Sequence, residues 1–223
     1  MLKILRGQKV FRRAIVYIVG FFIAAFGIAL SITANLGVTA GSALPYIISL
    51  ILGRTPGMVM TITFCSYILI QIAILRKKFR VINIFQIIPA ILLGSFVDFS
   101  LWILGDFRIP TYAGQLIMMI TGIILLSLGL ILIFDSKFVN LPLESLADAC
   151  AQVFPNRKHL CKFHVWKIIV DSVSVVTGVI LALIFLGELA GIREGTFLAA
   201  VLIGKIMPYI RKVSDPVLRK IGL

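Results

Sequence analysis

Apolar residues run along the chain in stretches long enough to cross a lipid bilayer. A transmembrane helix needs roughly 20 mainly apolar residues, and the sequence contains six such stretches. They are Ala14–Ala34, Met58–Leu75, Val81–Leu104, Tyr112–Phe134, Val165–Leu186 and Thr196–Ile210. Two shorter apolar segments, Gly41–Leu52 and Leu141–Phe154, follow the first and fourth stretches. Because about a dozen residues are too few to cross, we expect these two segments to form short helices that re-enter the membrane or lie at its interface.

The composition excludes a soluble domain and a disordered chain. Of the 223 residues, 60% are hydrophobic and 14% are charged, whereas soluble domains are about a quarter charged. Disordered chains combine low hydrophobicity with high charge, which is the opposite pattern. The first apolar stretch is longer than the core of a secretory signal and further spans follow it, so we interpret it as the first helix. The predicted fold is an all-α membrane protein with six transmembrane helices.

Basic residues cluster at the ends of the apolar stretches and account for the net charge of +13. Most of the 22 Lys and Arg residues lie before the first stretch, after the second, after the fourth and after the sixth. These four groups are Lys3, Arg6, Lys9, Arg12 and Arg13; Arg76, Lys77, Lys78 and Arg80; Lys137, Arg157, Lys158 and Lys162; and Arg211, Lys212, Arg219 and Lys220. With six crossings all four groups share one side, which the positive-inside rule assigns to the cytoplasm. We therefore expect both termini in the cytoplasm, a lipid bilayer as the partner and no nucleic acid.

The two halves of the chain, 1–110 and 111–223, contain the same elements in the same order. Each half has a long span, a short segment, a second long span, a loop and a third long span. Three crossings per half make the second half start on the opposite side, so the halves form an inverted-topology pair of three-helix repeats. Such pairs with interrupted segments are typical of secondary transporters, which bind their solute at the repeat interface. The alternative is an old duplication that serves only as a packing scaffold.

Glycines recur at the same positions of the two halves. A shift of 102 residues places Gly20 on Gly122 and Gly27 on Gly129. Small residues let helices approach closely in lipid, so we expect all four to pack against other helices. Polar residues within the spans, Gln71 among them, are expected to form hydrogen bonds between helices.

The start of the first short segment is a candidate binding site. Gly37 and Gly41 permit unusual backbone angles, and Thr39 or Ser42 can cap a helix that begins here. Free N–H groups and the positive end of the helix dipole would favour an anion or a carboxylate at this helix start.

Four charged residues extend this candidate site. Glu144 and Asp148, in the second short segment, share one helix face. They lie either in the exposed headgroup zone or in a proton or cation site, where like charge raises the pKa of one carboxyl. Asp171 and Lys205 lie inside predicted spans at similar depth, where charges usually face a cavity or a partner. They could pair with each other, Lys205 could neutralise Glu144, or Lys205 could extend to the surface.

Asp98 is the acidic residue in the third predicted span. Its nearest basic neighbours along the chain are Arg54 and Arg108, and it could also be plainly exposed. The complete set of residues that we expect to line a substrate or ion pathway is Gly37, Thr39, Gly41, Ser42, Asp98, Glu144, Asp148, Asp171 and Lys205.

Metal binding and catalysis are not expected. Cys150, His159, Cys161 and His164 include residue types that bind zinc, but their spacing fits none of the usual paired-ligand patterns. The sequence contains no Gly-x-Ser-x-Gly, His-Glu-x-x-His or phosphate-binding loop. We therefore predict no metal, no cofactor and no enzymatic activity.

Motifs of the first half carry a family resemblance. They are Gly20 with Gly27-Ile-Ala-Leu, Ala34-Asn-Leu-Gly-Val-Thr-Ala-Gly-Ser42, Arg76-Lys-Lys-Phe-Arg80 and Leu93-Gly-Ser-Phe-Val-Asp98. In these motifs the chain resembles the YczE/YyaS/YitT type of bacterial integral membrane proteins. The resemblance implies the topology above and a bacterial inner membrane, without naming a substrate.

The predicted function is transport or export of a small solute by alternating access between the halves. The alternative is a substrate-binding or accessory subunit that works with a separate energising or partner protein. The chain could also assemble as a homodimer.

Overall fold

The structure is a computed structural model that describes residues 2–153 and 163–221. In these two ranges the chain forms eight α-helices, two 3₁₀-helices and no strand. The elements are α1 (Leu2–Thr33), α2 (Ala40–Leu52), α3 (Pro56–Leu75), η1 (Arg76–Lys78), η2 (Val81–Gln86), α4 (Ile87–Leu104), α5 (Tyr112–Asp135), α6 (Pro142–Val153), α7 (Phe163–Phe185) and α8 (Glu194–Ile221). Several residues named in the predictions, namely Phe154, Arg157, Lys158, His159, Cys161 and Lys162, lie outside the described residues.

Within the described residues, five segments are helical, long and apolar enough to cross a membrane. They are Val10–Thr33, Pro56–Lys78, Val81–Leu104, Tyr112–Asp135 and Phe163–Phe185, and they correspond to the first five predicted spans. The sixth predicted span lies within α8, whose apolar part in the described residues, Glu194–Ile203, is shorter than a bilayer requires. Lys205 and Pro208 follow this apolar part inside the same helix. The helices indicate a membrane-embedded, all-α protein.

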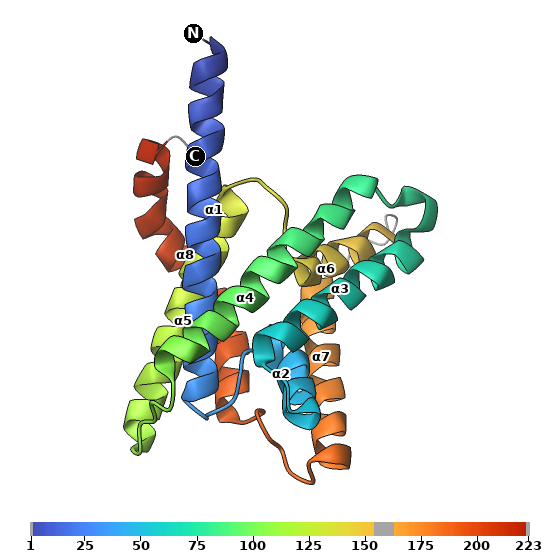
Figure 1. Cartoon of the computed structure of the whole chain (residues 1–223), viewed down its shortest axis with the longest axis vertical. Coiled ribbons are helices and arrows are strands. Elements are labelled where there is room, and N and C mark those ends of the chain that lie inside the picture. The colour runs from blue at the N-terminus through green and yellow to red at the C-terminus, as the bar shows by residue number, and fades with distance from the viewer. Residues whose placement is uncertain (1, 154–162, 222–223) are drawn as a thin grey trace.

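The long helices run between two ends of an elongated bundle. Figure 1 shows the start of α1 and the end of α8 at the same end, together with the α3–α4 and α5–α6 connections. We call this the basic end, because α1 and these connections hold Arg12, Arg76 and Lys137. The α1–α2, α4–α5 and α7–α8 connections lie at the opposite end. This placement agrees with the predicted grouping of basic residues on one side.

Helices α1 and α5 cross at two pairs of glycines. A β-carbon added to Gly27 would lie 2.5 Å from the carbonyl oxygen of Gly122. One added to Gly129 would lie 2.6 Å from the carbonyl oxygen of Gly20. Later residues of one helix meet earlier residues of the other, so the two helices are antiparallel. The prediction that the four glycines pack against other helices is confirmed.

The glycine pairs also follow the internal repeat. The 102-residue shift makes Gly129 the equivalent of Gly27, yet Gly129 contacts Gly20. The same shift makes Gly122 the equivalent of Gly20, yet Gly122 contacts Gly27. This exchange of partners is the pattern that a twofold axis between two equivalent surfaces produces.

The other helix contacts repeat with the same exchange of halves. The repeat makes α1, α2, α3 and α4 equivalent to α5, α6, α7 and α8. The α1–α4 contact has its counterpart in α5–α8, the α2–α7 contact in α6–α3, and the α2–α3 contact in α6–α7. One contact breaks the pattern. Helix α3 packs closely on α4 through Gly57 and Gly94, whereas α7 and α8 make no comparably extensive contact in the described residues.

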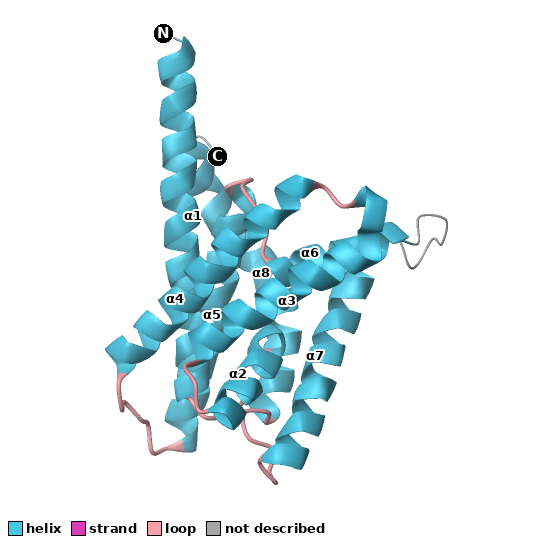
Figure 2. Cartoon of the chain, turned by 45° about the vertical axis from the view of Figure 1, so that its right-hand side comes forward, coloured by secondary structure: helices cyan, strands magenta, loops and turns pink. Residues whose placement is uncertain are grey.

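The two short helices are buried inside the bundle, and their N-terminal ends meet. Most residues of α2 and of α6 are buried or partly buried. A β-carbon added to Gly41 would lie 2.8 Å from Cδ2 of Leu143, and the 102-residue shift makes these two positions equivalent. From this contact α6 extends toward the basic end and α2 toward the other end (Figure 2). The positive ends of two helix dipoles therefore face one interior region.

Candidate functional site

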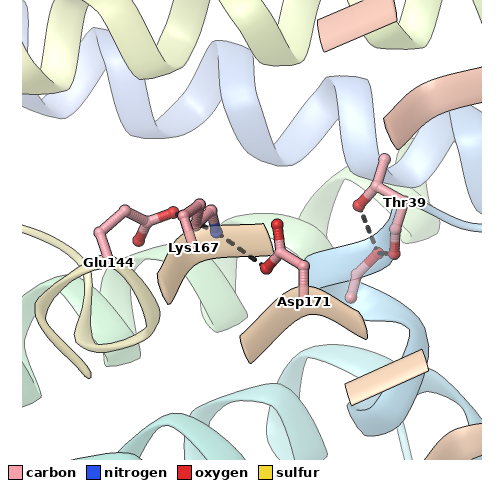
Figure 3. A network of polar contacts seen from close by, with 5 residues as sticks. Thr39, Glu144, Lys167 and Asp171 are labelled. Atoms are coloured by element: carbon pink, nitrogen blue, oxygen red, sulfur yellow. Dashed lines mark hydrogen bonds and ion pairs between the residues drawn. The ribbon is translucent and has the colours of Figure 1, made fainter. Parts of the chain in front are cut away.

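Three charged side chains meet where α6 packs on α7. Nζ of Lys167 donates hydrogen bonds to Oε1 of Glu144 at 3.1 Å and to Oδ1 of Asp171 at 3.0 Å (Figure 3). Glu144 belongs to the first turn of α6. Lys167 and Asp171 lie on consecutive turns of α7. Residues four apart share a helix face, so their side chains can meet. We call Glu144, Lys167 and Asp171 the charged cluster; with all three groups ionised it carries a net charge of about −1.

One carboxylate of the charged cluster is incompletely satisfied. Only 9% of the Glu144 side chain is exposed, against 26% for Lys167 and 25% for Asp171. Oε2 of Glu144 is buried and has no hydrogen-bond partner among the described residues. A buried carboxylate oxygen without a partner costs free energy, and a proton or a cation bound there would remove that cost.

The dipole of α6 favours the negative charge of Glu144. Glu144 lies beside the free N–H groups at the start of α6, and Figure 3 shows Asp171 between Lys167 and Thr39, at the start of α2. Negative charge is stabilised near a helix N-terminus. Since the chain's own Glu144 carboxylate lies at the positive end of α6, the arrangement suits a proton or a cation better than the anion expected from the first short segment alone.

The start of α2 has the expected cap position with a different hydrogen bond. Thr39 is the residue before the first helical turn, with extended backbone angles, but its hydroxyl accepts no bond from a helix N–H. Instead it lies 2.7 Å from the hydroxyl of Ser42, which also donates to the carbonyl oxygen of Thr39. Gly37 has φ +111°, and an added β-carbon would lie 2.7 Å from Oγ1 of Thr196, so glycine is required there. These residues shape the start of α2.

Asp98 is placed away from the charged cluster and caps another helix. Its Oδ1 accepts the N–H of Gly57 at 2.7 Å. Its Oδ2 accepts the N–H of Met58 at 3.1 Å and the hydroxyl of Thr55 at 2.7 Å. The carboxylate on α4 thus satisfies the N-terminal groups of α3, where negative charge is favourable. Neither Arg54 nor Arg108 is its partner among the described ion pairs.

Of the three alternatives that the sequence left open for Lys205, the structure shows the exposed side chain, and Lys167 is the cation that contacts both carboxylates. Lys205 is exposed and forms no ion pair within the described residues. It lies on α8, which does not pack extensively on α6 or α7, whereas Lys167 is one turn from Asp171 on the same face. The four-residue spacing of Lys167 and Asp171 in the sequence was the signal that could have identified this pair.

Asp148 is exposed and lies one turn beyond Glu144, in a polar cavity. It accepts a hydrogen bond from Nε2 of Gln152 at 2.8 Å. The cavity has a volume of about 420 Å³ and lies between α3, η2, the α5–α6 connection and α6. Gln71 and Gln86, both buried, line it and exchange two amide hydrogen bonds. The predicted interhelical hydrogen bonding of Gln71 is confirmed, but the cavity itself was not predicted.

Possible metal ligands do not gather in the described part of the chain. No group of three or more His, Cys, Asp or Glu side chains there could hold a metal ion. Cys65 and Cys150 are free cysteines. Of the residues that suggested zinc, His159 and Cys161 lie outside the described residues.

Comparison with known proteins places the chain in a family. A family model described as a family of unknown function (DUF6198) matches residues 11–212, which is most of the chain. The chain belongs to the DUF6198 family. No curated protein matches it, and no solved structure matches it. Membership of DUF6198 agrees with the expectation of an uncharacterised membrane family, while the narrower resemblance to the YczE/YyaS/YitT type stays a prediction.

Proposed function

We propose that the protein is a secondary transporter that moves a small solute across a bacterial cell membrane by alternating access, coupled to protons or a cation at the charged cluster. The observation that carries this proposal is the buried Glu144 carboxylate, which bonds to Lys167 through one oxygen and has no partner for the other among the residues that the structure describes. Ionisable groups within membrane helices are costly and usually serve ion or substrate pathways. A scaffold kept only for packing would not need three charged groups here.

A proton or cation on Glu144 would change how α6 is held against α7. In the present arrangement Lys167 is shared between Glu144 on α6 and Asp171 on its own helix. When Glu144 is neutralised, its attraction for the Lys167 ammonium weakens, and Lys167 keeps Asp171 as its charged partner. The ionic contact between the two helices is then reduced. Binding at the cluster would therefore shift the equilibrium between two packings of α6.

The helix arrangement supports alternating access. Transporters with inverted repeats bind at the repeat interface and move one repeat against the other. In this chain α1 and α5 are antiparallel, and contacts between helices exchange the halves 1–110 and 111–223. We infer two inverted repeats with α2 and α6 as re-entrant helices, both termini in the cytoplasm, and the charged cluster at the repeat interface.

The test is flux through purified protein in liposomes under an imposed pH gradient. Solutes are added by class, with an internal dye reporting proton movement. We expect at least one class to dissipate the gradient with the wild type, and Glu144→Gln or Asp171→Asn to abolish that coupling. Glu188→Gln, at an exposed position of the α7–α8 connection, is the matched control and should retain flux.

Two results would contradict the proposal. In the first, no solute class moves with any gradient. In the second, a solute moves and both cluster variants leave its coupling unchanged. A stoichiometric ATPase that co-purifies in mild detergent would instead favour the accessory-subunit alternative.

A further inference from the structure

The cavity beside α6 has the size and the lining of a small-molecule site. Its volume of about 420 Å³ falls within the range of ligand-binding pockets, roughly 300–1,000 Å³. One face of α6 lines it through Ser145, Asp148 and Gln152, which lie on successive turns. The α5–α6 connection contributes Lys137 and Asn140. Because these elements belong to the basic end, the cavity opens toward the side that we place in the cytoplasm.

The inner wall of the cavity is a fixed pair of amides. Nε2 of Gln71 donates to Oε1 of Gln86 at 3.0 Å and to the carbonyl oxygen of Pro142 at 3.0 Å. Nε2 of Gln86 donates to Oε1 of Gln71 at 3.2 Å. Gln71 is 1% exposed and Gln86 is 3% exposed. Such buried, mutually bonded amides are held rigidly, and each carbonyl oxygen keeps a second lone pair for a ligand N–H or O–H.

The charged groups of the cavity balance each other. Among the described residues that line it, Lys137 is the cation and Asp148 is the anion. Neither forms an ion pair with another described residue. A net cationic or net anionic solute would leave one of the two charges uncompensated, whereas a solute with both charges would pair with each.

We propose that this cavity is the cytoplasm-facing site for a small zwitterionic solute, with its carboxylate on Lys137, its ammonium on Asp148 and its polar remainder against the amides. The inference rests on the proposed transport function and names its substrate class. Asp148 follows Glu144 by one turn, about 6 Å along α6. The solute site and the charged cluster therefore share one short helix, and a change in the packing of α6 would reach both.

Binding to the purified wild-type protein in detergent tests this inference without any gradient. Calorimetry would compare L-glutamine, a zwitterion with a carboxamide, with myo-inositol, putrescine and succinate. Glycerophosphoethanolamine tests whether the zwitterion is a lipid headgroup. We expect L-glutamine to bind more tightly than all four. Asp148→Asn and Lys137→Met should each weaken it at least about tenfold, because each removes a charge-assisted hydrogen bond. Asp106→Asn, the same change at an exposed loop position, should leave binding unchanged.

The outcomes separate this inference from the proposed function. The inference is overturned if L-glutamine does not bind, if inositol, putrescine or succinate binds more tightly, or if both cavity variants bind as the wild type does. Tighter binding of glycerophosphoethanolamine would assign the cavity to a lipid headgroup and would overturn the proposal that it binds a small solute. Binding of L-glutamine with the expected losses, but without flux in liposomes, would support the site and refute transport.

Discussion

Replacing Lys167 by Met removes the single cation of the charged cluster and keeps the length of the side chain. Both of its hydrogen bonds, at 3.1 Å to Glu144 and 3.0 Å to Asp171, are lost. Breaking a buried ion pair costs about 3–5 kcal/mol because an uncompensated charge remains, whereas exposed pairs are worth about 0–1 kcal/mol. The Glu144 side chain is nearly fully buried, while the side chains of Lys167 and Asp171 are about a quarter exposed, so the cost should lie between these two ranges. We therefore expect Lys167→Met to lower the free energy of unfolding by about 2–4 kcal/mol.

The assay is denaturant unfolding in mixed micelles, followed by the helical circular dichroism signal. Lys77→Met, at an exposed position of η1, is the control and should change stability by less than about 0.5 kcal/mol. A triple variant that adds Glu144→Gln and Asp171→Asn to Lys167→Met removes the uncompensated charges. Replacing a buried ionic network by well-packed apolar residues is often close to neutral. The triple variant likewise leaves no uncompensated charge, so it should recover most of the lost stability.

The reasoning about the charged cluster would be refuted by either of two results. If Lys167→Met unfolds at the same denaturant concentration as the wild type, the two carboxylates do not depend on this cation. If the triple variant is no more stable than Lys167→Met alone, the loss comes from packing and not from uncompensated charge.

Other predictions concern the α1–α5 crossing, the α3 cap and a buried thiol. Gly122→Leu should destabilise the protein by at least about 1–3 kcal/mol in the same unfolding assay, because even a β-carbon would lie 2.7 Å from the carbonyl oxygen of Gly27; wild-type stability would contradict the close crossing. Asp98→Ala should cost about 0.5–2 kcal/mol and speed hydrogen exchange at Gly57 and Met58, and unchanged exchange there would exclude the cap. Burial raises the pKa of the Cys150 thiol, so its alkylation should need more alkaline pH than that of glutathione. In a double variant, Cys65→Ser and Cys161→Ser, Cys150 is the remaining thiol, so the alkylation rate of the protein is its rate. A pH dependence of that rate equal to that of glutathione would contradict the burial of Cys150.

The sequence was sufficient to predict the helical membrane class, the short helices and the packing role of the repeated glycines, because these depend on local periodicity and spacing. Gly20 and Gly27 lie two turns apart on one helix face, which indicates a packing surface, but only the structure shows that Gly122 and Gly129 are their partners. The depth of Asp171 within a predicted span likewise indicated a charged site. The sequence left the cation partner of Asp171 and Glu144 open, because depth along the chain says nothing about which helices are neighbours. Only the packing of α6 on α7, and not on α8, selects Lys167 over Lys205.

Other residues depend on tertiary structure that has no local signature. Asp98 caps α3 by accepting the N–H of Gly57, 41 residues earlier in the chain, and no pattern within α4 reveals that role. The cavity arises from the meeting of four elements, and its amide pair joins Gln71 to Gln86 across the α3–α4 connection.

The close α3–α4 contact without an α7–α8 counterpart has a mechanical consequence. In the first half, two glycines and the Asp98 carboxylate fasten neighbouring helices together. In the second half, α7 packs mainly on α2 and α6. Only 17% of the most apolar stretch of α7 is buried in the protein, against 33% for the segment that contains α4. Regions with few buried contacts open at the lowest free energy. We therefore expect α3 and α4 to move as one unit, whereas α7 has fewer buried contacts that hold it in place.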